Sequence, residues 1–93
     1  MGISVLVVGN GGREDALSWR LAQSPSVERI CAAPGNAGTA SRGDNWEIAA
    51  TDGKALVERA KREGIALAVI GPETAIAAGV SDQLRDGGIL IYV

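Results

Sequence analysis

The glycine-rich segment close to the N-terminus carries the residue types in this sequence that best suit ligand chemistry. An apolar run at residues 5–8 leads directly into the turn Gly9-Asn10-Gly11-Gly12, which Arg13 and Glu14 follow. Glycine has no Cβ atom, so backbone N–H groups in such a turn can approach a ligand closely. A helix that begins there adds unpaired N–H groups and the positive end of its dipole. The segment therefore predicts an anion site, most suitably for phosphate, with the Arg13 guanidinium as an extra cation.

The same glycines have an alternative interpretation, a tight strand-to-helix turn with close packing and no ligand. A dinucleotide fits the turn poorly, because its fingerprint requires a third glycine where Glu14 stands. It also requires an acidic residue at the end of the second strand, where this sequence has Ala32-Ala33-Pro34. One phosphate therefore suits the turn better than two.

Two further segments with turn-forming residues follow apolar runs. They are Pro34-Gly35-Asn36-Ala37-Gly38-Thr39 and Gly71-Pro72-Glu73-Thr74. The first is equally consistent with ordinary turn chemistry and with ligand contact. In the second, Glu73 could accept hydrogen bonds from sugar hydroxyls, or it could simply stabilise a helix N-terminus.

The elements that must position these segments are strands that alternate with helices. Apolar runs rich in Val and Ile alternate with amphipathic stretches, which is typical of an α/β sheet. The sequence predicts strands at about residues 3–8, 28–33, 46–49, 66–70 and 89–93. It predicts helices from about residue 12 to 24, from Thr51 or Asp52 to Gly64, and up to Gly87-Gly88. Their apolar faces are expected to contain Leu17 and Leu21, then Leu56, Val57 and Ala60, then Ile76, Val80 and Leu84. Between the second and third strands we expect no crossover helix, only a turn and a polar loop through Asn45.

Right-handed crossovers predict a doubly wound parallel sheet of about five strands in the order 3-2-1-4-5. Ligands in such sheets bind beyond the carboxyl ends of the strands, where the strand order reverses. The three turn segments are expected to meet at that edge.

The composition narrows the possible functions. A chain of 93 residues suffices for one small domain, and its site is expected to be a surface crevice. The net charge of −2 and the scattered basic residues argue against nucleic acid and against a membrane surface as partners. The absence of histidine excludes histidine-based acid–base catalysis and histidine metal sites. Cys31 is the single cysteine, and no export signal is present, so we expect a cytoplasmic protein.

Together, the three turn segments resemble the N-terminal domain of glycinamide ribonucleotide synthetase, also called phosphoribosylamine-glycine ligase. The resemblance extends over nearly the whole chain. It implies a Rossmann-like, pre-ATP-grasp domain of a purine-biosynthesis ligase that joins phosphoribosylamine to glycine through glycyl phosphate. ATP and magnesium bind to later domains of that family, which are absent here. We therefore expect no cofactor, no metal and no catalytic residue in this chain.

The resemblance also implies a set of phosphoribosyl-binding residues. Arg13 and the loop amides would hold the phosphate, and Glu73 would face the sugar. The complete set is Gly9, Asn10, Gly11, Gly12, Arg13, Glu14, Gly35, Asn36, Gly38, Thr39 and Glu73.

The sequence departs from the family pattern at several points. Asp15 stands where the family has histidine; its charge suits the helix dipole but repels a nearby phosphate. Ala75 and Ile76 stand where the family usually has proline and leucine.

The sequence stops at Val93, which suggests an excised, reconstructed or engineered domain. We expect such a domain to form homo-oligomers through its last strand or a former domain interface. A ligand-free structural module remains the alternative, whereas a complete small enzyme is disfavoured because the sequence offers no activated nucleophile or carboxylate cluster.

Overall fold

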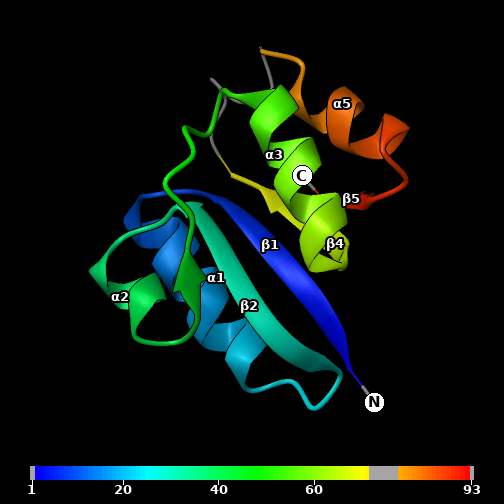
Figure 1. Cartoon of the computed structure of the whole chain (residues 1–93). Coiled ribbons are helices and arrows are strands. Elements are labelled where there is room, and N and C mark those ends of the chain that lie inside the picture. Colours follow the sequence, from blue (N-terminus) through cyan, green and yellow to red (C-terminus); the bar gives the residue numbers. More distant parts are fainter. Residues whose placement is uncertain (1, 72–77, 93) are drawn as a thin grey trace.

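Five parallel strands form one sheet in the order β3-β2-β1-β4-β5, with helices on both faces (Figure 1). The computed structural model describes residues 2–71 and 78–92. The strands are β1 (Ile3–Gly9), β2 (Val27–Pro34), β3 (Asp44–Asn45), β4 (Ile65–Ile70) and β5 (Leu90–Tyr92). The helices are α1 (Gly12–Ala22), α2 (Ala37–Ala40), α3 (Gly53–Glu63) and α5 (Val80–Asp86). The predicted α/β fold class and strand order are confirmed.

The central strand β1 is buried on both faces, as its continuous apolar sequence predicts. The side chains at positions 5–8 have no exposed surface. Leu6 and Val8 belong to a core cluster with the inner faces of α3 and α5, whose buried members include Leu56, Ala60, Val80 and Leu84. Helix α1 packs against β1 and β2 on the other face of the sheet, and α2 lies beside it (Figure 1).

Local signals fix the ends of the helices. Asp52 is the N-cap of α3, and its side chain accepts a hydrogen bond from the backbone N–H of Ala55 at 3.3 Å. Gly64 ends α3 with a φ of 73°, a left-handed conformation that glycine adopts without strain. Gly87 is the C-cap of α5. These boundaries agree with the predicted ones.

The prediction of a third strand at Trp46–Ala49 is wrong. The strand is Asp44–Asn45, and it pairs with Cys31 and Ala32 of β2. Trp46 instead turns its large side chain into the core, where only 1% of the residue is exposed. Burial of this aromatic side chain outweighs its strand preference.

The prediction that no helix lies between the second and third strands is also wrong. A single turn of helix, α2, is present there, and Asn36 is its N-cap. Four residues are too few to give a periodic apolar pattern, so this element leaves no clear signal in the sequence.

The residues that helix α1 buries differ from the predicted ones. Leu17 and Leu21 are only half-buried, whereas Glu14 and Ser18 are its fully buried residues. The polar character of this face reflects its position beside the loops at the carboxyl edge. The predictions for Pro72, Glu73, Thr74, Ala75 and Ile76 lie outside the described residues.

The β5 end of the sheet exposes large apolar side chains. Leu90 is 72% exposed and Tyr92 is 66% exposed. In the described part of the chain, β5 pairs with β4 and forms the end of the sheet. Among the described helices, none is long and apolar enough to cross a membrane.

Candidate functional site

Three strand ends meet at one edge of the sheet. The backbone N–H of Gly35 donates to the carbonyl of Gly9 at 3.0 Å, and the N–H of Gly71 donates to the carbonyl of Val8 at 3.2 Å. These bonds extend the parallel pairing with β1 by one residue beyond the ends of β2 and β4. The predicted convergence is confirmed for the first two segments and for Gly71, while the rest of the third segment lies outside the described residues.

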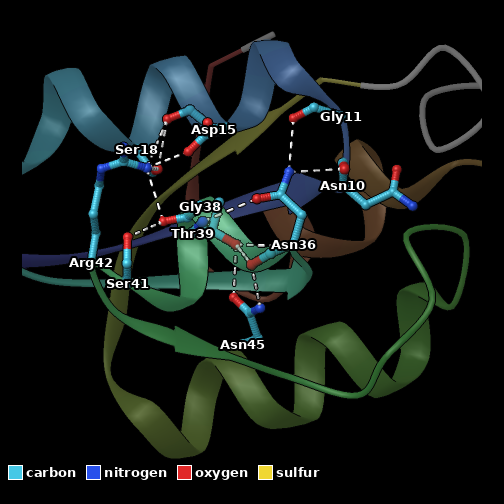
Figure 2. A network of polar contacts seen from close by, with 10 residues as sticks. All are labelled: Asn10, Gly11, Asp15, Ser18, Asn36, Gly38, Thr39, Ser41, Arg42 and Asn45. Carbon is cyan, nitrogen blue, oxygen red and sulfur yellow. Dashed lines mark hydrogen bonds and ion pairs between the residues drawn. The ribbon is translucent and has the colours of Figure 1, made fainter.

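The second segment is fastened directly onto the first. The side-chain amide of Asn36 donates to the carbonyls of Asn10 at 2.9 Å and Gly11 at 3.1 Å (Figure 2). The Asn36 Oδ1 accepts a hydrogen bond from the backbone N–H of Thr39 at 3.0 Å. Asn36 therefore joins the glycine turn to the start of α2.

Glu14 lies inside the glycine turn and is only 5% exposed. Its Oε2 accepts a hydrogen bond from the backbone N–H of Gly11 at 3.2 Å, so the carboxylate caps the helix that it belongs to. A Cβ atom at Gly9 or at Gly71 would overlap the Glu14 side chain. These two glycines therefore make room for Glu14, which is a structural reason for their presence.

The first turn of α1 remains open at Gly12. A Cβ atom at Gly12 would meet no atom within 4 Å, and both Gly12 and Arg13 are exposed. The N–H groups of a first helical turn have no acceptor within the helix. The Arg13 guanidinium donates to the carbonyl of Gly71, which links the first and third segments. Helix N-termini with such unpaired N–H groups are positions at which proteins commonly bind anions.

Arg42 was not among the predicted site residues, yet it holds α1 against α2. It forms an ion pair with Asp15 and donates to the carbonyl of Gly38 at 2.9 Å and to the Ser18 Oγ at 3.2 Å (Figure 2). A Cβ atom at Gly38 would overlap the Asp15 carboxylate. Arg42 therefore opposes the negative charge that Asp15 brings to the first turn of α1. A single arginine in a polar loop gives no spacing signal, and this role could not be predicted from the sequence.

The structure thus brings together every described residue of the predicted set. The side chains of Glu14, Asn36 and Thr39 are engaged in hydrogen bonds within the protein. Within the described residues, a hollow of about 230 Å³ lies at the other end of β2, lined by Val27, Glu28, Arg29 and their neighbours, and is not part of this edge. Among the same residues, no group of three or more His, Cys, Asp or Glu side chains is placed to hold a metal ion.

Comparison with known proteins places the chain in a family. Residues 3–92 match the family described as Phosphoribosylglycinamide synthetase, N domain. The chain is 49% identical over 90 residues to a phosphoribosylamine–glycine ligase from Neisseria meningitidis serogroup A, covering 97% of this chain and 21% of the relative. It is 49% identical over 92 residues to the Escherichia coli protein of that name, with the same coverage. For a Nostoc relative the identity is 44% over 92 residues, with 97% and 22% covered.

The chain spans about a fifth of the length of these relatives. The matched region includes the glycine turn, the Asn36 segment and the whole described sheet. This chain belongs to the phosphoribosylglycinamide synthetase family and corresponds to its N domain.

Proposed function

We propose that this domain holds the phosphoribosyl part of phosphoribosylamine, with the phosphate at the Gly12 and Arg13 end of helix α1. The relatives are named for a reaction that joins phosphoribosylamine to glycine. A domain that covers a fifth of such a protein can contribute one substrate subsite. The residues of this domain suit a subsite for an anion.

The open first turn of α1 carries this proposal. Gly12 borders free space, its N–H group has no acceptor within the helix, and the exposed Arg13 lies next to it. Two negative groups nearby are already engaged, because Glu14 accepts from Gly11 and Asp15 pairs with Arg42. Their charges therefore oppose an incoming phosphate less than free carboxylates would.

Calorimetry with ribose 5-phosphate tests the proposal. We expect weak binding that Arg13→Ala weakens roughly tenfold, since a charge-assisted hydrogen bond is lost. Arg20→Ala is the matched control, because Arg20 is an exposed arginine in the last turn of the same helix. Absence of heat with the wild-type chain would overturn the proposal, and equal loss in both variants would remove the role of Arg13.

The joining reaction itself is assigned to the longer protein. In this proposal the ATP and magnesium sites belong to segments beyond the chain, in a cytoplasmic ligase of purine biosynthesis. The 93-residue chain is therefore expected to show no glycine-dependent ATP hydrolysis. Hydrolysis by the purified chain, abolished when glycine is omitted, would contradict this assignment.

The exposure of Leu90 and Tyr92 favours a second proposal for the isolated chain, self-association through β5. This strand is an edge with no charged residue, and its large apolar side chains project into solvent. Such an edge is suited to pairing with a second copy. A reconstructed or engineered module without a ligand would associate in the same way.

A further inference from the structure

We propose that Asn36 is a positioning residue that sets the direction of the Gly11 and Gly12 N–H groups and does not itself bind ligand. Its effect on affinity rests on the phosphate site proposed above, whereas its effect on the turn can be observed without a ligand.

The direction of these N–H groups follows from peptide geometry. In a trans peptide, the carbonyl of one residue and the N–H of the next point in opposite directions. The Asn36 amide donates to the carbonyls of Asn10 and Gly11, at 2.9 and 3.1 Å, and the Gly11 carbonyl also accepts the first hydrogen bond of α1 from the Asp15 N–H at 3.1 Å. The N–H groups of Gly11 and Gly12 must then point away from Asn36. The bond from the Gly11 N–H to the Glu14 Oε2 agrees with this direction.

Both polar atoms of the Asn36 side chain are engaged. The Nδ2 donates to two carbonyls, and the Oδ1 accepts from the Thr39 N–H. Exchange of the two atoms would place an oxygen against two carbonyl oxygens and an N–H₂ group against an N–H donor. The hydrogen-bond network therefore allows one orientation of the amide and leaves it no free N–H group for an anion.

Asn36 is itself held by Thr39 and by Asn45 of β3. The Asn45 Nδ2 donates to the Asn36 carbonyl at 2.9 Å, and the Thr39 Oγ1 donates to the Asn45 Oδ1 at 2.8 Å (Figure 2). The Asn36 N–H donates to the Thr39 Oγ1 at 2.7 Å. Thr39 is 1% exposed, so the two bonds that its Oγ1 makes are partly shielded from water, whereas the bond from the Asn45 Nδ2 is exposed. The two-residue strand β3 thus supplies the support for the side chain that orients the glycine turn.

Asn36→Ser separates the two tasks of the asparagine. Serine is a good N-cap and can still accept from the Thr39 N–H, but it is too short to reach Asn10 and Gly11, and it adds no charge. We expect the amide NMR signals of Gly11 and Gly12 to move in the ligand-free protein and their hydrogen exchange to accelerate. Affinity for ribose 5-phosphate should fall roughly tenfold while α2 remains formed.

Ser41→Ala is the matched control. The Ser41 Oγ donates to the Gly38 carbonyl at 2.7 Å, and Ser41 follows directly after α2. This variant should leave the Gly11 and Gly12 signals and the affinity unchanged. Asn36→Asp is a second test should the serine variant fail to fold, because aspartate keeps the cap but sets a carboxylate against two carbonyls.

The outcomes separate the two proposals. Reduced affinity with unchanged Gly11 and Gly12 signals would mean that Asn36 binds the ligand directly, and this would overturn the inference. Unchanged signals and unchanged affinity would overturn it as well. If the wild-type chain binds no ribose 5-phosphate, the proposed function fails, and the amide signals of the ligand-free variants alone decide the role of Asn36.

Discussion

Arg42 and Asp15 form an ion pair that joins helix α1 to the segment following α2. The side chains are 23% and 39% exposed, and the guanidinium also donates to the Gly38 carbonyl and to the Ser18 Oγ. The pair holds α1, which follows the glycine turn, against the segment that follows α2. It also explains how an aspartate is accommodated in the first turn of a helix that is proposed to face a phosphate.

Arg42→Ala is expected to lower the free energy of unfolding by about 1 kcal/mol, because it removes the ion pair together with hydrogen bonds to groups that are partly shielded. Arg85→Ala is the comparison, since Arg85 pairs with Asp82 at 59% and 80% exposure on α5. Urea denaturation of both variants measures the difference. An equal effect of the two substitutions would show that the Arg42 contacts add nothing beyond a surface pair.

Substitution by alanine is expected to lower the free energy of unfolding at Gly9 but not at Gly12. Gly9 has a φ of 140°, and a Cβ atom there would overlap Glu14, so Gly9→Ala should cost about 1–3 kcal/mol. Gly12 has open space, and Gly12→Ala should be neutral or slightly stabilising. Thermal denaturation of the two variants tests this; a large loss for Gly12→Ala would refute the open geometry of the turn.

Acid stability is expected to depend on Glu63. A hydrogen bond from Arg29, followed by one from Arg59, lowers the pKa of this carboxyl below its ordinary value. Since the folded pKa is the lower one, the stabilisation is present above the unfolded pKa and is lost as the pH falls through the folded pKa. Glu63→Gln should therefore be less stable than wild type at pH 7, with a smaller difference at pH 3. A pH-independent difference would contradict the ion-pair account.

Cys31 is expected to be inert in the folded protein. The residue has no exposed surface, and burial raises the pKa of its thiol, so little reactive thiolate forms. Alkylation by iodoacetamide at pH 8 should be slow in buffer and fast in denaturant. Rapid labelling of the native chain would mean that β2 opens far more often than its position between β3 and β1 suggests.

The isolated chain is expected to associate with itself, and Leu90→Lys together with Tyr92→Lys should reduce this association. Charges on an edge strand oppose pairing and remove exposed apolar surface. Sedimentation velocity over a range of concentrations provides the measurement. A strictly monomeric wild-type chain at high concentration would exclude the proposal.

The sequence correctly predicted the strands and helices whose apolar residues form a long continuous or periodic pattern. β1, β4 and α3 each combine a continuous or periodic apolar pattern with a glycine or a cap at a boundary, and each formed where expected. The parallel order followed from these elements and from the handedness of their connections. The convergence of the loops at one edge followed from that order.

The short elements and the side-chain partners could not be predicted. The two residues of β3 and the four of α2 are too few for a period, and Trp46 favoured a strand at a position where burial in the core determines its conformation. Arg42 and Asn45 act on residues 27 and 9 positions away, and the identity of such partners depends on the assembled fold. The sequence predicted Glu14 and Asn36 as ligand residues; their side chains form hydrogen bonds within the turn, and their contact with a ligand stays a prediction.

The phosphate site at the first turn of α1 is tested most directly by titrating the ¹⁵N-labelled chain with ribose 5-phosphate and following each backbone amide. We predict saturable shifts that are largest at Gly12 and Arg13, and smaller shifts around Asn36. Unchanged spectra at high ligand concentration, or shifts confined to β5 and the far end of β2, would contradict it.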